Sequence, residues 1–345
     1  MKKVCFFSSD ARPLYKQDVF RAMSYPNGYV IHFRYQQQHV NGGLQELLTK
    51  PGVIFFSMGN DLLIEPQNRV ITHASIREVK VHSIETATDT GQIHFYLELG
   101  DFKVITLGQN SANIMPPNKF VTELETIDGP VAQWYQIIDI IKASFPNQLF
   151  YKFQMLNKKS SDPLTLSYDK VEKQSFYKLS DEKSYALEMA FYDTESSSSN
   201  NYHSLKISAI DDKLLQVVAP ATIDLEARRD NRVYSLFTKT VSSSNSFTYI
   251  SFETLLKTAG SSASTEESSK IDTTLKIQVK KSVNRSLAFA LYSLMAALAI
   301  GYAKVLTDQV DVLGTVNTNL TLQFVICGFI AALAAFNLYR LFDKK

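Results

Sequence analysis

Near its C-terminal end the chain contains SLAFALYSLMAALAIGYA from Ser286 to Ala303 and LTLQFVICGFIAALAAFNLY from Leu320 to Tyr339. These stretches have 18 and 20 residues and no charged side chain. At about 1.5 Å per residue, each would form a helix that crosses or nearly crosses a hydrocarbon core of roughly 30 Å. Two buried core helices are the alternative, but two such adjacent stretches at a chain end are unusual in soluble domains. The sequence therefore predicts a two-helix transmembrane hairpin over residues 286–345.

Basic residues flank the pair of stretches on its outer sides. The segment between them, residues 304–319, has one lysine and two aspartates. The positive-inside rule then places both termini in the cytoplasm and residues 1–280 in the cytosol. Met1–Phe7 is too short for the hydrophobic core of a signal peptide, which agrees with this topology. The flanking basic residues are Lys276, Lys280, Lys281 and Arg285 before the first stretch, and Arg340, Lys344 and Lys345 after the second.

Small residues recur along one side of each predicted span. In the first span they are spaced four, three, four and four residues apart, which places them on one stripe of a helix. Small side chains let helix backbones approach closely in lipid. The stripe either packs the two helices of one hairpin together, or packs helices of different subunits and lines a narrow pore. Two helices cannot enclose a water-filled path, so a channel requires an oligomer. The residues are Ser286, Ala290, Ser293, Ala297 and Gly301, with Gly328, Ala331, Ala332 and Ala335 in the second span.

Asn337 is the one strongly polar side chain deep in the second span. Its amide predicts an interhelical hydrogen bond, and a pore-lining role is the alternative. Neither span has a charged residue at its centre, which argues against a proton relay or a secondary transporter.

The whole sequence has 36 basic and 34 acidic residues, of which residues 281–345 hold six and three. Residues 1–280 therefore carry 30 basic and 31 acidic residues and are nearly neutral. Short alternating stretches separated by turns predict an α+β, mostly β fold. We expect a β-rich domain over 1–146 with helices near 11–23 and 131–145. A second β-rich domain, sandwich or barrel-like, follows over 147–258, and 259–285 is a linker and juxtamembrane segment. Gly100-Asp101 predicts a hairpin between strands at 93–99 and 102–107.

Residue patterns typical of enzymes and metal sites are missing from the sequence. It has no nucleotide-binding glycine motif, no HExxH and no nucleophile elbow. The six histidines and two cysteines lack metal-ligand spacing, and Cys5 is expected to be an inert buried thiol. We therefore predict no enzymatic activity, no cofactor and no metal.

Two clusters of basic and aromatic residues could recognise an anionic ligand such as a nucleotide or an oligonucleotide. Arginine pairs with phosphates and aromatic rings stack on bases. The alternative is a solvated face with local salt bridges, for example to Glu226 and Asp230. The first cluster is Arg34 and Tyr35, with Arg12, Lys16 and Arg21 just before them. The second is Arg228, Arg229 and Arg232, close to Tyr234.

A large cytosolic region on a minimal membrane module predicts an oligomeric, ligand-gated membrane effector or ion channel. Ligand binding would bias two arrangements of the soluble domains, and residues 271–281 would couple them to helix packing. The alternatives are a non-conducting, membrane-anchored scaffold and a membrane-tethered enzyme of unfamiliar type.

The order of these parts resembles the channel subunits of Hailong-type anti-phage defence systems. The resemblance rests on SSDARPLYKQDVF (Ser8–Phe20), YVIHFRY (Tyr29–Tyr35), the long β-rich region and the two terminal spans. It implies a homotetrameric channel in the bacterial inner membrane. It also implies that single-stranded DNA oligomers made by a partner nucleotidyltransferase hold the channel closed until infection. The two basic clusters would then be candidate oligomer-binding sites.

Overall fold

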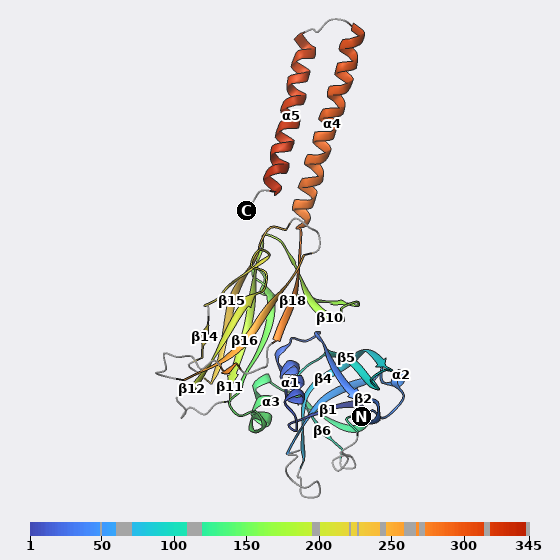
Figure 1. Cartoon of the computed structure of the whole chain (residues 1–345), viewed down its shortest axis with the longest axis vertical. Helices are drawn as coiled ribbons and strands as arrows, with labels where there is room; N and C mark the ends of the chain where they lie inside the picture. Colours follow the sequence, from blue (N-terminus) through green and yellow to red (C-terminus); the bar gives the residue numbers. More distant parts are fainter. Residues whose placement is uncertain are drawn as a thin grey trace. The chain divides into compact units, whose positions relative to one another are not determined.

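The computed structural model describes residues 1–48, 50–59, 71–108, 119–194, 201–220, 222–225, 228–241, 246–258, 267–268, 273–313 and 318–342 (Figure 1). More of the described residues lie in strands than in helices, so the chain is mostly β, as predicted. By its internal contacts the chain divides into two units, which we describe separately. Unit 1 is Met1–Lys178, Ser184–Phe237 and Thr248–Ile277; unit 2 is Leu179–Lys183, Thr238–Phe247 and Gln278–Lys345.

The first sheet has seven strands in the order β2-β5-β4-β3-β1-β7-β6. β1 pairs with β3 in parallel and with β7 antiparallel. The strands are β1 Lys2–Ser9, β2 Val30–Gln36, β3 Pro51–Met58, β4 Thr72–Ala87, β5 Gln92–Leu99, β6 Lys103–Leu107 and β7 Val121–Val131.

Both faces of this sheet are buried at β1, which explains its unbroken apolar sequence. One face carries a cluster of Cys5, Phe7, Val53, Phe55, Ile105 and Leu124. The sheet curls around this cluster, because the Ser75 hydroxyl of β4 donates to Lys103 O and accepts from Ile105 N, both at 2.8 Å. The other face is covered by a helix, since the Ser8 hydroxyl donates to Tyr15 O at 2.7 Å.

Within the described residues, four short helical segments accompany the first sheet. α1 (Pro13–Ser24) begins with a proline in its first turn, as its sequence predicts. α3 (Trp134–Ile141) buries Trp134, Ile137, Ile138 and Ile141 at helical spacing, as predicted, and continues as a 3-10 turn over Lys142–Ser144. α2 (Leu44–Leu47) and a 3-10 turn at Gln37–His39 complete the set.

The fully buried guanidinium of Arg77 holds the end of α1 to the sheet. It donates to Ala22 O at 2.9 Å, to Tyr25 O at 2.7 Å and to Gly100 O at 2.6 Å. Burial lowers the pKa of Arg77 to about 9, against the opposing charge of Asp101. A cation at a helix C-terminus is favoured by the orphan carbonyls and the helix dipole. Arg77 therefore acts as the cap that the sequence of α1 does not supply.

The second part of unit 1 is a β-sandwich, one of the two alternatives predicted for residues 147–258. One sheet runs β13-β15-β11-β8, and the other β14-β12-β16-β18-β10-β9 with β17 beside β16. The strands are β8 Leu149–Asn157, β9 Leu166–Asp169, β10 Gln174–Ser180, β11 Ser184–Asp193, β12 Asn201–Ala209, β13 Leu215–Val218, β14 Ile223–Asp224, β15 Arg229–Thr238, β16 Ser246–Thr258, β17 Glu267–Ser268 and β18 Thr273–Lys280.

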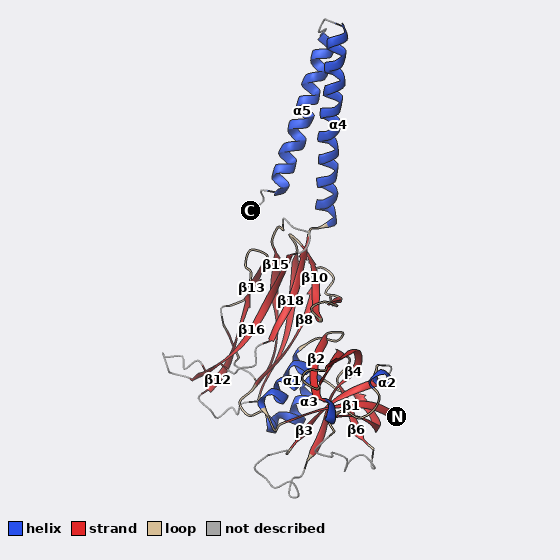
Figure 2. Ribbon diagram, turned by 45° about the vertical axis from the view of Figure 1, so that its right-hand side comes forward, coloured by secondary structure: helices blue, strands red, loops and turns tan. Residues whose placement is uncertain are grey.

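Aromatic side chains fill the space between the two sheets of the sandwich. Phe153 stacks on Phe252 with ring centroids 4.7 Å apart, and the Tyr151 hydroxyl lies 2.6 Å from the Thr273 hydroxyl. α1 closes one edge of this core (Figure 2), where Phe20 stacks on Phe150 at 5.5 Å and the Tyr25 hydroxyl donates to Thr274 O at 2.9 Å. The first sheet and the sandwich therefore share α1.

Unit 2 contains α4 (Val283–Leu313) and α5 (Thr318–Phe342). Within the described residues, one helix is long and apolar enough to cross a membrane, by way of its 21-residue stretch Leu287–Thr307. α5 has a shorter apolar stretch, Val325–Asn337. Leu306 and Cys327 are buried together beside Ala303, so the two helices contact each other. The second transmembrane span stays a prediction.

The predicted hairpin at Gly100-Asp101 is wrong. β5 pairs with β2 and β4, whereas β6 pairs with β7. Gly100 N donates to Glu78 O at 2.8 Å and Asp101 O accepts from Glu78 N at 3.0 Å, so the connection crosses β4 instead of turning back. Most of β7, as well as β10, was not anticipated from the sequence.

We expect Arg77→Met to lower the free energy of unfolding by about 3 kcal/mol or more. The methionine fills much of the same volume but leaves three buried carbonyl oxygens without donors. Chemical denaturation followed by circular dichroism measures the loss. Arg34→Met, at an exposed arginine, is the matched control and should change the stability by less than about 0.5 kcal/mol. Equal effects of the two substitutions would contradict the capping role.

Candidate functional site

Tyr35 is a packing residue in the structure, not a platform for a ligand. Its hydroxyl donates to Phe7 O at 3.2 Å, and its ring meets Phe95 edge-on at 6.0 Å. Burial raises the pKa of Tyr35 well above its ordinary value, helped by the nearby Asp18 carboxylate. Tyr35 therefore lies on the side of β2 that faces the core, whereas the predicted ligand-stacking role needs an exposed ring.

Arg34 stands on the other side of β2 and is exposed. It lies near Arg21, because both arginines act electrostatically on Asp18 of α1. Burial raises the pKa of Asp18 to about 6 although both cations favour its ionised form, and Arg21 Nη1 is 3.5 Å from its carboxylate. The structure thus brings Arg21 and Arg34 together around one acid.

The other two basic residues of the first cluster do not join this group. The Arg12 guanidinium lies 5.9 Å from the ring of Tyr15, within its own helix turn. Lys16 donates to Ser144 O at 2.7 Å. The five residues predicted as one cluster therefore form two arginines around an acid and two separate local contacts, with Tyr35 in the core.

A column of rings lies beside Arg34 and was not anticipated from the sequence. His32 stacks on His94 and on Tyr96, with centroids 5.0 Å and 5.1 Å apart, and His32 Nε2 is 2.9 Å from His94 Nδ1. Burial, with the charges of His94 and Arg34, lowers the pKa of His32 to about 4, so this imidazole is neutral at pH 7. The sequence pattern that could have indicated this column is the alternation of polar rings with apolar residues along β2 and β5.

The second cluster separates into two faces of β15. Arg228 and Arg229 both lie over the ring of Tyr192 at 5.2 Å, and Arg229 also lies over Tyr135 at 4.4 Å. Arg232 instead pairs with Asp230 at 2.6 Å, as the salt-bridge alternative predicts. The alternation of side chains along a strand puts Arg229 and Arg232 on opposite faces. The predicted grouping of Arg232 with Arg228 and Arg229 is therefore wrong, and Glu226 lies outside the described residues.

Asp139 of α3 gathers the groups around Arg229. It accepts from the Tyr192 hydroxyl at 2.5 Å, from Arg229 at 2.6 Å and from Lys142 at 3.0 Å. Partial burial opposes ionisation of Asp139, but these hydrogen bonds and cations outweigh it and lower the pKa of the carboxyl. The surface of Arg228, Arg229, Lys142 and Asp139 keeps a positive excess, with two tyrosine rings beside it.

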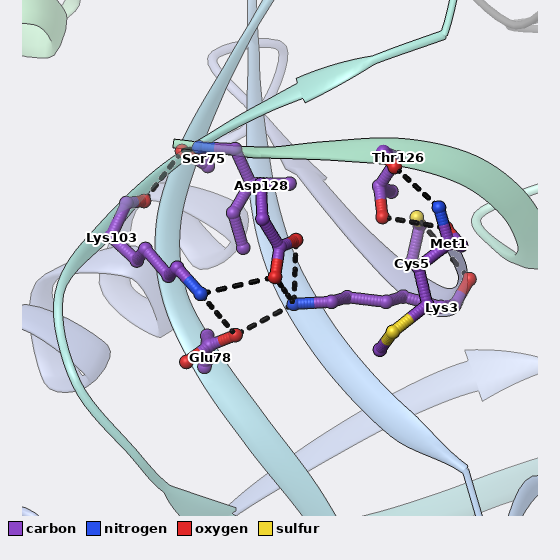
Figure 3. Close-up of polar contacts among 9 residues, drawn as sticks. Met1, Lys3, Cys5, Ser75, Glu78, Lys103, Thr126 and Asp128 are labelled. Atoms are coloured by element: carbon purple, nitrogen blue, oxygen red, sulfur yellow. Dashed lines mark hydrogen bonds and ion pairs between the residues drawn. The ribbon is translucent and has the colours of Figure 1, made fainter. Parts of the chain in front are cut away.

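A third charged group closes one end of the curled sheet (Figure 3). The Lys3 ammonium, with its side chain 1% exposed, lies 2.6 Å from Glu78 and 2.9 Å from Asp128. Lys103 contacts the same two acids at 3.5 Å and 3.0 Å. Two cations and two anions balance, so the group stabilises the join of β1, β4, β6 and β7 and offers no excess charge to a ligand.

The described residues of the predicted small-residue stripe of α4 lie on the side that α5 leaves uncovered. Ala290, Ala297 and Gly301 are exposed and Ser293 is half-buried, while the side chain of Ser286 lies outside the described set. A Cβ atom at Gly301 would meet nothing within 4 Å. Among the described side chains of the two helices, those that are buried are Ala299, Leu306, Cys327 and Ala334. The described stripe residues of α4 are therefore not the ones that contact α5 in this structure.

Among the described residues, Asn337 makes a hydrogen bond within its own helix and none to α4. Its amide donates to Leu333 O of α5 at 2.8 Å. The carbonyl one turn earlier in the same helix is the nearest acceptor for an amide side chain at this position. A role of Asn337 in a pore stays a prediction.

Known proteins offer no family for this chain. No family model and no curated protein matches it. Among solved structures, WR4, a member of the MSP family from C. elegans, is 6% identical, with a TM-score of 0.21; the match covers 30% of this chain and 92% of WR4. A mutant of the CFA/I adhesin CfaE from enterotoxigenic E. coli is 9% identical, with a TM-score of 0.16, over 81% of this chain and 97% of CfaE.

We expect Asp139→Asn to lower the stability at pH 7 by about 1–2 kcal/mol, because it weakens charge-assisted hydrogen bonds at a partly exposed site. The folded-state pKa of Asp139 lies below its unfolded value, so its contribution is complete above about pH 4 and disappears as the pH falls through the folded value. Urea denaturation between pH 7 and pH 3 should show the two proteins converging at the acid end. The exposed Asp212→Asn variant is the control; a constant difference across this range would contradict the assignment.

Proposed function

We propose that the protein is an oligomeric, ligand-gated membrane effector or ion channel. Its helices α4 and α5 form a two-span hairpin in the bacterial inner membrane, with both termini in the cytoplasm. Its β-rich region senses an anionic signal, a nucleotide or single-stranded DNA oligomer supplied by a partner nucleotidyltransferase. The resemblance to Hailong-type channel subunits suggests antiviral defence as the setting and a tetramer as the assembly.

The observation that carries this proposal is the exposed apolar surface of α4. Only 11% of the most apolar part of the helix, within Leu287–Thr307, is buried. Leu287, Leu291, Leu298 and Ile300 are between 52% and 65% exposed. Each such side chain gains about 1.5–3 kcal/mol when it leaves water, so a helix of this kind favours lipid or partner helices.

The position of the small-residue stripe supports assembly of several chains. Ala290, Ala297 and Gly301 lie on a side of α4 that α5 leaves uncovered. Small residues on a lipid-exposed side allow a helix of another subunit to approach closely. A ring of α4 helices packed through this stripe would also supply the enclosure that one hairpin lacks.

Two surfaces of unit 1 suit an anionic signal. One is Arg21 and Arg34 beside the rings of His32 and His94; the other is Arg228 and Arg229 over Tyr192. Arginine and aromatic rings together recognise phosphates and bases. We favour the second surface, because Tyr135 and Tyr192 flank its arginines and Tyr135 is 38% exposed.

Replacing Gly301 or Ala297 with leucine should weaken the oligomer and reduce membrane depolarisation. The added side chain would keep neighbouring helices apart, and a loss of roughly 1.4 kcal/mol would shift the association midpoint about tenfold. Mass measurements in detergent report the assembly relative to the 38.9 kDa chain, and a membrane-potential dye reports conductance. Leu298→Phe adds bulk at an exposed position outside the stripe and should leave both readouts unchanged.

Unchanged mass and depolarisation in the Gly301 and Ala297 variants would overturn the role of the stripe. An oligomer that never depolarises the membrane would favour the non-conducting scaffold instead.

The ligand surface makes a separate prediction. The double variant Arg228→Gln/Arg229→Gln should bind a labelled single-stranded oligonucleotide at least about tenfold more weakly than the unchanged chain, since two phosphate contacts are lost. Arg232→Gln should bind normally, because Asp230 already holds that arginine. Fluorescence anisotropy at fixed salt measures both. Equal affinities for all three proteins, or no binding by the unchanged chain, would contradict this assignment.

A further inference from the structure

The base of α4 is held by three chain segments that lie far apart in the sequence. The turn between β10 and β11 donates Asp181 N to Lys280 O at 2.7 Å, and the Asp181 carboxylate accepts from Ser282 N at 2.7 Å. Glu182 N donates to Thr238 O, and Thr238 N donates to Lys183 O, both at 3.0 Å. The ends of β10, β15 and β18 therefore meet within unit 2, directly before α4 begins at Val283.

This meeting point collects lysines. In the described part of unit 2 outside its helices, the cations are Lys183, Lys239, Lys280 and Lys281. The acids there are Asp181 and Glu182. Asp181 is 1% exposed and its carboxylate accepts from a backbone amide, and Glu182 accepts from the Thr240 hydroxyl at 2.8 Å. Lys183 and Lys280 are exposed, and no carboxylate within the described residues pairs with Lys183, Lys239 or Lys280. The loops around the base of α4 thus carry a positive excess.

The depth of these lysines along α4 suits a headgroup layer. Ser282 lies five residues before Leu287, where the apolar stretch begins. At about 1.5 Å per residue this is roughly 7 Å, close to the thickness of the polar layer on each side of a bilayer. Lys281 Nζ lies 5.1 Å from the ring centroid of Phe289, so its charge is held against the first turns of α4.

We propose that Lys183, Lys239, Lys280 and Lys281 form a basic collar that binds the phosphates of anionic phospholipids where α4 enters the membrane. The inference rests on the proposed insertion of α4. Lysines near an anionic membrane surface each contribute about 1 kcal/mol, which is about fivefold in affinity. The collar would fix the depth of α4 and would make the assembly sensitive to the lipid charge of the membrane.

The test titrates the full chain, purified in dodecyl maltoside, with phosphatidylglycerol, phosphatidylcholine or inorganic phosphate while its thermal unfolding midpoint is recorded. Phosphatidylglycerol should raise the midpoint in a saturable manner, and the other two should not. Replacing all four collar lysines with glutamine should raise the half-saturating concentration of phosphatidylglycerol at least about tenfold. Replacing Lys2, Lys80, Lys170 and Lys213, four exposed lysines of unit 1, is the matched control and should leave it unchanged.

Four results would overturn the collar: an equal response to phosphatidylcholine, no response to any lipid, a response that the fourfold variant keeps, or an equal response to inorganic phosphate, which would indicate a site for a free anion. If the variant with all four lysines replaced misfolds, the double variant Lys183→Gln/Lys280→Gln, at the two exposed positions, is used in its place. Flotation with phosphatidylcholine vesicles tests insertion alone. A chain that does not float contradicts the proposed function itself, whereas a chain that floats without any dependence on lipid charge contradicts only the collar.

Discussion

The contact between the apolar side chains of α4 and their solvent is the constraint on which the functional account depends. Leu287, Leu291, Leu294, Leu298 and Ile300 are all more than half exposed. α5 covers only one side of α4, where Ala299 and Leu306 are buried. Exposing these apolar side chains to water is unfavourable, and lipid avoids that exposure without any further protein contact. A helix can lie in lipid because it satisfies its own backbone hydrogen bonds. The proposals about assembly, gating and the lysine collar all require that α4 lies in lipid.

Within unit 1, the arrangement of charges explains how a β-rich region with little net charge could still recognise an anion. Some arginines have a structural role: Arg77 donates hydrogen bonds to three carbonyl oxygens, and Arg232 forms an ion pair with Asp230. Near the Tyr192 ring, by contrast, two arginines and Lys142 face one acid: Asp139 accepts hydrogen bonds from Arg229, Tyr192 and Lys142, and Arg228 lies over the same tyrosine ring. A candidate binding surface is therefore recognised by a local excess of positive charge and by exposed aromatic rings, more than by the net charge of the region.

Local patterns predicted much of the fold, while long-range pairing escaped them. β1 and α3 were predictable because burial on both faces and helical spacing appear directly in their sequences. β7 was missed because its acidic residues and Gly129-Pro130 resemble a loop, although β1 and β6 hold it on either side. The inward turn of Tyr35 and the separation of Arg232 from Arg229 depend on which neighbour covers each face. Lys183 and Lys239 reach the base of α4 through contacts between segments roughly 55 to 100 residues apart, which no local pattern records.

Alkaline carbonate extraction of membranes from cells that produce the full chain tests the central claim most directly. If α4 lies in lipid, the protein stays in the pelleted membranes at high pH and needs detergent to become monodisperse. Recovery of the chain in the carbonate supernatant, or a monodisperse protein without detergent, would show that its exposed leucines are covered in some other way.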